Sequence, residues 1–292
     1  MARPQAAACK MRRPGHIGRA ARRSDAPPGF ERNMPNKVIA IANQKGGVGK
    51  TTTSVNLASC VADAGHRVLL IDMDPQGNAS SGVGFDRAQC DGSIYHALTE
   101  QDEIDNLVYA TDYESLLLIP STTDLAGAEI ELVDHDRREF MLREAIARMT
   151  REFDFIFLDC PPSLGLLTIN ALVAADTVLV PIQTEYYALE GLGHLLHTIS
   201  LIHEHLNPKL SIEGILLTMY DARTNLSSQV ADEVATHFGE LLFKTVIPRN
   251  VKLSEAPSFG QPIIAYDKSS RGSKSYQSCA KEFLARNGVS AA

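Results

Sequence analysis

The chain has 292 residues, of which 44% are hydrophobic, so it can bury a large core. Its formal net charge of −7 excludes a protein that binds nucleic acid through a basic surface spread over the whole molecule. No uncharged apolar stretch approaches the roughly 20 residues of a membrane-spanning helix, so we expect a soluble protein. The five cysteines have no paired or metal-binding spacing, which fits a reducing compartment.

The first 33 residues differ in composition from the rest of the chain. They hold eight basic and two acidic residues among many Pro, Gly and Ala, which predicts a disordered segment. A basic arm that binds DNA phosphates and an organellar transit peptide are two interpretations. We favour a third, a start-site artefact with initiation at Met34, because Met34 directly precedes the first predicted strand. Without residues 1–33, 20 basic and 33 acidic residues remain, a net charge of −13.

Strand-like apolar runs alternate with helical stretches throughout 34–292. The predicted strands cover 37–42, 67–71, 115–119, 153–158, 176–182, 212–219 and 242–247. This alternation is typical of one doubly wound, mostly parallel α/β sheet with helices on both faces. Because no internal repeat or low-complexity linker divides the segment, we expect 34–292 to form a single domain.

A glycine-rich loop, 45–53, follows the first predicted strand and precedes a helical stretch. Its glycines let the backbone come close to a ligand, and its N–H groups can surround phosphate oxygens at the start of the helix. Lys50 is placed to reach the β- and γ-phosphates, and the Thr51 hydroxyl to ligate Mg²⁺. The predicted phosphate-binding segment is Gly46, Gly47, Val48, Gly49, Lys50, Thr51 and Thr52.

A second lysine, Lys45, lies at the front edge of this loop. From this position a lysine points away from the phosphates that its own loop wraps, and it can reach phosphates bound by a facing subunit. A cation supplied in that way would neutralise charge that develops in the transition state. The alternative is a solvated lysine on the rim of a loop.

Aspartates follow two of the predicted strands. Asp72 and Asp74 come after 67–71, and Asp159 comes after 153–158. The carboxyl ends of parallel strands face the crevice where α/β folds bind ligands. Phosphoryl transfer needs mainly positioning and charge, so one carboxylate for magnesium and one for water would be enough. For Asp72, the capping of a turn and a functional role both remain open.

These motifs, together with the later segments 185–191, 218–224 and 247–257, closely resemble the ParA/Soj family of chromosome-partitioning ATPases. That family lies within the deviant P-loop group that also includes MinD. The resemblance runs from about Lys37 to about Phe283. It implies a P-loop fold of the deviant Walker A type, ATP hydrolysis that depends on Mg²⁺, and ATP and Mg²⁺ as cofactors.

The resemblance also implies roles for single residues. Lys45 matches the lysine that contacts nucleotide across a dimer, and Lys50 and Thr51 match the phosphate lysine and the Mg²⁺ ligand. Asp74 matches the aspartate that positions the attacking water, and Asp159 matches the carboxylate that holds Mg²⁺ through water. The implied catalytic residues are Lys45, Lys50 and Asp74. The implied adenine contacts are Met219, Pro248 and Asn250, and the implied DNA contacts are Arg223 and Lys252.

The partners implied by the resemblance are a second copy, non-specific DNA and a ParB-like centromere-binding protein. The implied location is the bacterial cytoplasm, in association with the nucleoid. Because 34–292 is acidic, any DNA contact must come from a local basic patch. Its candidates are Arg223, Arg249, Lys252, Lys268, Arg271 and Lys274, and we interpret Lys268 and Lys274 as solvated charges.

Two other functions compete with this hypothesis. A MinD-like membrane-associated positioning ATPase requires an amphipathic C-terminal helix rich in basic residues. The C-terminal stretch 275–288 instead predicts a helix that packs on the core, so we expect no stable membrane association. Its apolar positions are Tyr276, Cys279, Ala280, Phe283 and Leu284. A metabolic P-loop enzyme related to dethiobiotin synthetase would need an acceptor site, and the segment 185–187 is better explained as a packed loop at a subunit interface.

Overall fold

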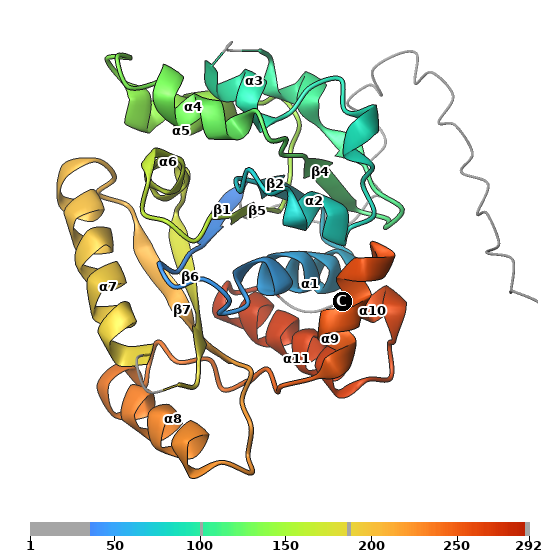
Figure 1. Cartoon of the computed structure of the whole chain (residues 1–292), viewed down its shortest axis with the longest axis vertical. Coiled ribbons are helices and arrows are strands. Elements are labelled where there is room, and N and C mark those ends of the chain that lie inside the picture. The colour runs from blue at the N-terminus through green and yellow to red at the C-terminus, as the bar shows by residue number, and fades with distance from the viewer. Residues whose placement is uncertain (1–35, 100–101, 186–187, 290–292) are drawn as a thin grey trace, which may run out of the picture. The chain divides into compact units, whose positions relative to one another are not determined.

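The computed structural model describes residues 36–99, 102–185 and 188–289. These residues form a seven-stranded sheet in the order β3-β4-β2-β5-β1-β6-β7 (Figure 1). Neighbouring strands are parallel, except that β3 is antiparallel to β4. The doubly wound, mostly parallel α/β fold is therefore confirmed. The strands are β1 (Lys37–Ile41), β2 (Val68–Asp72), β3 (Tyr109–Ala110), β4 (Leu116–Ile119), β5 (Phe155–Asp159), β6 (Thr177–Gln183) and β7 (Ser211–Thr218).

Helices cover both faces of the sheet (Figure 1). One face packs against α1 and α11, and the other against helices that include α5, α6 and α7. The helices are α1 (Lys50–Asp63), α2 (Asn78–Gly82), α3 (Ile94–Thr99), α4 (Leu125–Glu131), α5 (Met141–Arg148), α6 (Leu166–Ala174), α7 (Ala188–His205), α8 (Asn225–Phe238), α9 (Val251–Glu255), α10 (Ile263–Tyr266) and α11 (Arg271–Arg286).

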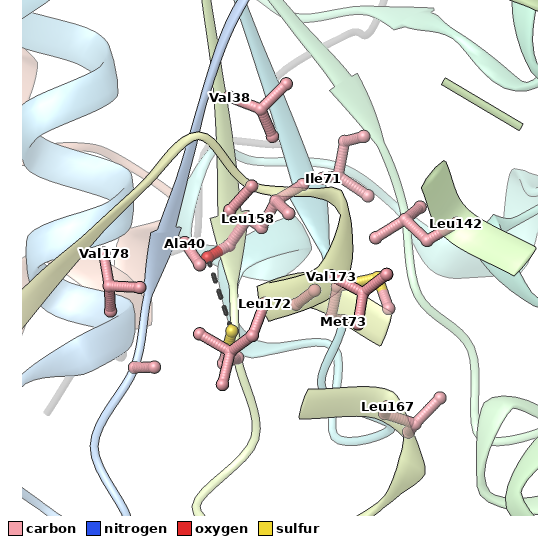
Figure 2. Packing of buried hydrophobic residues seen from close by; sticks show 14 of the residues in the cluster. Val38, Ala40, Ile71, Met73, Leu142, Leu158, Leu167, Leu172, Val173 and Val178 are labelled. Atoms are coloured by element: carbon pink, nitrogen blue, oxygen red, sulfur yellow. Dashed lines mark hydrogen bonds between the residues drawn. The ribbon is translucent and has the colours of Figure 1, made fainter. Parts of the chain in front are cut away.

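The alternation of strand side chains divides the core into two layers. Val38 and Ala40 of β1 belong to one layer, and Ile39 and Ile41 belong to the other. Figure 2 shows the first layer, in which residues of α6, among them Leu172, lie next to residues of β1, β2 and β5. Because both faces are covered, the central strands are apolar at almost every position.

The C-terminal helix α11 packs beside α1 on the second face. The Phe283 ring lies 5.1 Å from the Phe155 ring and 5.5 Å from the Phe157 ring, measured between centroids. The Tyr276 hydroxyl lies 3.1 Å from Thr53 Oγ1 in α1. The apolar face predicted for this helix is buried, so its prediction as a core helix is confirmed. Through these contacts α11 supports the helix that follows the glycine-rich loop.

The predicted strand at 242–247 is wrong. The segment runs along β7, but Leu242 forms only an isolated bridge with Ile215, and Pro248, just after the segment, forms another with Tyr220 beyond the end of β7. Between these bridges, the amides of Lys244 and Thr245 donate to the carboxylate of Glu282 in α11, at 2.7 and 2.9 Å. Because these N–H groups turn toward α11, the ladder with β7 is interrupted.

An ion pair ties the start of β1 to β7 and to the end of α11. Lys37 Nζ donates to Glu213 Oε2 at 2.7 Å and also to Asn287 Oδ1. Thr177 Oγ1 donates to the same Glu213 oxygen, and Asn287 Nδ2 donates to the other, both at 2.8 Å. The Glu213 side chain is only 4% exposed, so this carboxylate depends on its hydrogen-bond partners.

The 1–33 extension and the start-site hypothesis lie outside the described residues, as does the tyrosine pair at 186–187. Every helix among the described residues is too short or too polar to span a lipid bilayer.

Candidate nucleotide-binding site

The glycine-rich loop joins β1 to the start of α1. Gly47 and Gly49 have φ angles of 74° and 87°, which favour glycine because a side chain would be strained there. Gly49 is the N-cap of α1, so the unpaired N–H groups of the first turn are available to an anion. Thr218 Oγ1, at the end of β7, donates a 2.8 Å hydrogen bond to the Val48 carbonyl and holds the loop in place.

The predicted phosphate lysine, Lys50, lies inside the loop and is only 6% exposed. Its ammonium donates a 2.9 Å hydrogen bond to the Lys45 carbonyl. Burial lowers the pKa of Lys50, while the nearby carboxylates of Asp159 and Asp74 raise it. A phosphate would be a stronger acceptor than the loop carbonyl, because both partners would then be charged.

Two aspartates lie opposite each other at the ends of β2 and β5. Asp72 and Asp159 are paired in the strand register, and both are fully buried. Burial is the main cause that raises the pKa of each carboxyl group. Asp72 accepts hydrogen bonds from Ser80 N and Ser80 Oγ, both at 2.7 Å, and from Asp74 N at 3.2 Å. The oxygens of Asp72 are thus occupied by the turn that follows β2 and by the start of α2, which favours the structural interpretation of Asp72.

Asp159 has one occupied oxygen and one without a partner. Oδ1 accepts a 2.7 Å hydrogen bond from Ser54 Oγ. Among the buried side-chain nitrogen and oxygen atoms of the described residues, Oδ2 and one ring nitrogen of His66 lack a hydrogen-bond partner. After burial, the neighbouring Asp72 also raises the pKa of Asp159, while the nearby hydroxyls of Ser54 and Thr51 lower it.

This donor set fits Mg²⁺. The ion prefers hard oxygen ligands, and it commonly takes only one or two from the protein and the rest from phosphates and water. The Thr51 hydroxyl and the free Asp159 oxygen supply such ligands beside the phosphate loop. A divalent cation at this point would also favour the ionised carboxylate, which burial otherwise disfavours.

Asp74 lies in the turn after β2 and is 8% exposed. Its Oδ1 accepts a 2.9 Å hydrogen bond from Gln76 N. Its charge acts on both Lys50 and Asp159. The structure therefore brings together the three charged side chains that the sequence places at the phosphate end of the site.

Lys45 has a different environment from Lys50. Its ammonium lies 3.0 Å from Glu185 Oε2, and the two side chains are 39% and 46% exposed. Its backbone N–H donates at 3.0 Å to Asn43 Oδ1, and the Asn43 amide donates at 2.7 Å to the Pro181 carbonyl of β6. The loop entrance is thus anchored to β6, while the ammonium lies at the rim of the loop.

A cavity of about 450 Å³ adjoins the loop, a size typical of small-molecule sites. Met219, Pro248 and Asn250 line it together with Gly49 and Thr52. Met219 has a φ of 51°, which is uncommon for a residue other than glycine. The structure thus brings the three suggested adenine contacts to the phosphate loop. The other lining residues are Thr218, Ile247, Arg249, Val251, Leu253, Ser254, Pro257 and Tyr276.

The suggested DNA contacts, Arg223 and Lys252, do not line this cavity. The Arg223 side chain is 85% exposed, and its guanidinium donates to both oxygens of Asp221, at 2.9 and 2.7 Å. These hydrogen bonds hold the pKa of Asp221 below its usual range. Lys252 pairs with Glu255 at 2.8 Å. Both cations are therefore exposed, and each has a carboxylate partner close in sequence.

Three polar residues that the sequence motifs do not indicate hold the site together, namely Asn43, Ser54 and Thr218. A signal existed for Ser54. It lies three residues after Thr51 in a helix, a spacing that puts both side chains on the same side of α1. The contacts of Asn43 with Pro181 and of Thr218 with Val48 join distant segments, and no local pattern indicates them.

Comparison with known proteins decides the family. A family model described as an AAA domain matches residues 36–212. The chain is 57% identical over 252 residues to the sporulation initiation inhibitor protein Soj of Bacillus subtilis, which covers 86% of this chain and 99% of that protein. It is 54% identical over 251 residues to the chromosome partitioning protein ParA of Myxococcus xanthus, which covers 86% and 89%. The chain belongs to the ParA/Soj family.

The fold of this ParA/Soj chain is also similar to a solved structure, that of cobyrinic acid a,c-diamide synthase from Mycobacterium smegmatis with bound ADP and magnesium. The TM-score is 0.76 and the identity 38%, over 87% of this chain and 96% of that one. Family and fold together confirm a chromosome-partitioning P-loop ATPase of the ParA/Soj type, with ATP and Mg²⁺ as its cofactors.

Proposed function

We propose that this ParA/Soj ATPase is a switch controlled by ATP. ATP joins two copies, the dimer binds DNA without sequence preference, and a ParB-like centromere-binding partner stimulates hydrolysis and release. The proposal places the protein in the cytoplasm, in association with the nucleoid. The observation that carries it is the contrast between the two lysines of the loop, because Lys50 is buried inside the loop and Lys45 is half-exposed at its rim.

In this proposal the role of each residue follows from its position in the site. Lys50 and the N–H groups of 46–52 bind the phosphates, and Thr51 and Asp159 hold Mg²⁺. Asp74 orients the attacking water, and Lys45 reaches the nucleotide of the facing copy. Phosphoryl transfer can proceed by such positioning and charge stabilisation without a covalent step on the protein. The cavity formed with Met219, Pro248 and Asn250 receives the adenine base.

A DNA-binding titration with ATP, with ADP and without nucleotide tests the switch. We expect tight binding only with ATP, equal affinity for unrelated DNA sequences, and a steep loss of affinity with added salt, since phosphate contacts release counterions. Equal DNA binding with ATP and ADP would contradict the proposal. Strong dependence on DNA sequence would contradict its non-specific part.

Lys45→Ala tests the contact between copies. We expect the variant to bind ATP with an affinity within about threefold of the parent, but to remain a monomer in light scattering at saturating ATP, because in this proposal the Lys45 ammonium contacts the phosphates of the facing copy's nucleotide and that charged contact exists only in the dimer. Lys252→Ala is the matched control, since it removes another half-exposed lysine that pairs with a glutamate. An ATP-dependent dimer of Lys45→Ala would count against the proposal.

Glu185→Gln tests the resting partner of Lys45. A half-exposed ion pair contributes up to about 1 kcal/mol, and the dimer joins two copies, so the loss of both pairs should strengthen ATP-dependent dimerisation by at most about 30-fold. The dimer dissociation constant is the measurement. A weaker dimer would show that Glu185 supports the interface instead of holding Lys45 away from it.

Arg223→Glu tests the DNA patch. We expect weaker DNA binding and, for a dimer, a salt dependence reduced by about two counterions, one for each lost phosphate contact. Nucleotide affinity should not change, because Arg223 does not line the nucleotide cavity. Arg137→Glu, an exposed arginine paired with Glu144, makes the same charge change elsewhere. Unchanged DNA retention by Arg223→Glu would remove this residue from the patch.

A MinD-like membrane function receives no support from α11. Its apolar residues are buried against the sheet and α1, so they are not available to insert into lipid. Liposome sedimentation with ATP distinguishes the two functions, because pelleting with lipid in the absence of DNA binding would favour the membrane alternative.

A further inference from the structure

Ser54 is a buried side chain of α1 that sequence motifs do not assign to the site. It is fully buried, and its hydroxyl lies 2.7 Å from Asp159 Oδ1 and 3.0 Å from the Lys50 carbonyl. A hydroxyl has one proton, so it cannot donate a full hydrogen bond to both acceptors at once. The carboxylate is closer, and hydrogen bonds to charged acceptors are the stronger ones. The Ser54 proton is therefore directed to Asp159.

Ser59, about one and a half turns further along the same helix, is a buried serine whose hydrogen bond stays within the helix. Its hydroxyl donates at 2.7 Å to the carbonyl of Val55, four residues earlier. This back-bonding is the common arrangement for serine within a helix. In Ser54 the corresponding contact to Lys50 is longer, which fits a hydroxyl that has turned toward Asp159.

The hydrogen bond distinguishes the two oxygens of Asp159. Oδ1 is occupied by Ser54, whereas Oδ2 is buried and has no hydrogen-bond partner. Asp72, which is equally buried, accepts its hydrogen bonds from Asp74 in the turn after β2 and from Ser80 in α2. Among these two strand-end carboxylates, Asp159 alone keeps an oxygen available, and Ser54 determines which oxygen it is.

We propose that Ser54 is a positioning residue that fixes the rotation of the Asp159 carboxylate, so that Oδ2 is presented to Mg²⁺. The proposal rests on the magnesium role proposed above for Asp159. Without Ser54, neither oxygen would be held, and the carboxylate would have to be oriented when the ion binds. Residues that orient a metal ligand in this way commonly affect metal affinity by 10- to 100-fold.

The test is a titration of Mg²⁺ while the binding of a fluorescent ATP analogue is measured, with Ser54→Ala, Ser59→Ala and Asp159→Asn compared with the parent chain. We expect Ser54→Ala to raise the Mg²⁺ concentration at half-saturation by about 10-fold. Binding of the analogue in EDTA should stay within about twofold of the parent, because Ser54 has no contact that a phosphate would replace. Ser59→Ala should match the parent in both measurements, since Ser59 lies away from Asp159.

The outcomes separate this proposal from the one on which it rests. If Asp159→Asn raises the half-saturation and Ser54→Ala matches Ser59→Ala, the role of Ser54 is refuted and that of Asp159 stands. If Asp159→Asn leaves the half-saturation unchanged, the magnesium role itself is refuted. Thermal unfolding in EDTA checks that each variant folds. Should Ser54→Ala fail to fold, Ser54→Cys keeps the size of the side chain with a weak donor, and its Mg²⁺ half-saturation must rise above the parent value for the proposal to stand.

Discussion

Asp74→Ala is expected to reduce the rate of ATP hydrolysis by about 10²- to 10⁴-fold, the range for the loss of a group that positions or activates water. ATP binding should persist, because the Asp74 carboxylate accepts its hydrogen bond from Gln76 N in its own turn and the phosphate loop keeps all its residues. ATP would then stay bound for longer than in the parent protein, because its hydrolysis is slowed. The variant should accumulate as an ATP-bound dimer that stays on DNA.

Single-turnover hydrolysis and gel filtration with saturating ATP measure this prediction. Asp91→Ala is the control, because it removes an exposed aspartate of the same charge that lies outside the nucleotide cavity. If Asp74→Ala is fully occupied by ATP but stays monomeric, the predicted accumulation of an ATP-bound dimer is wrong. Hydrolysis at the parent rate would exclude Asp74 from the reaction.

Lys37→Met is expected to lower the free energy of unfolding by about 3 kcal/mol, near the lower end of the cost of breaking a buried ion pair, because Lys37 is partly exposed. The substitution keeps the length of the side chain but leaves the Glu213 carboxylate, which is 4% exposed, without its cation. Thr177 and Asn287 still donate to that carboxylate, so the decrease in the free energy of unfolding should stay close to about 3 kcal/mol.

Urea denaturation without nucleotide measures the effect. Lys268→Met is the matched control, since its ammonium lies 3.9 Å from Asp63 and both side chains are more than half exposed, and it should change stability by less than about 1 kcal/mol. Adding Glu213→Gln to Lys37→Met should recover part of the loss, because the uncompensated charge is removed. A loss equal to that of the control would show that the Lys37 pair does not stabilise the fold.

Local patterns predicted most of this fold because the central strands are buried on both faces. Continuous apolar runs identified six of the strands to within two residues at either end. The segment 242–247 has a similar composition, but Glu282, far along the chain, takes two of its amides. The two-residue β3 is too short to produce a periodicity. The first difference arises from a contact between distant residues, and the second from the shortness of the strand.

The residues of the candidate site also fall into two groups, those that the local sequence indicates and those that depend on contacts between distant segments. Lys50 and Thr51 follow from the loop itself, and Asp74 and Asp159 follow from the rule that parallel strands end at one edge. The pairing of Lys45 with Glu185 spans 140 positions, and that of Ser54 with Asp159 spans 105. No spacing rule reaches across such separations. The three residues suggested for adenine came only from family resemblance, since nothing in their local sequence indicates a base pocket.

The segment beside β7 has a consequence for solubility. Ile215 N donates to the Leu241 carbonyl and Phe243 N donates to the Ile215 carbonyl, both at 2.8 Å, so outward backbone groups of this edge strand are already occupied. The segment approaches β7 so closely that a Cβ atom at Gly214 would lie 2.8 Å from the Leu241 carbonyl oxygen. At the other edge, β3 offers only two residues. Both borders of the sheet are therefore poor templates for a further strand, which protects crowded copies of the chain from edge-to-edge aggregation.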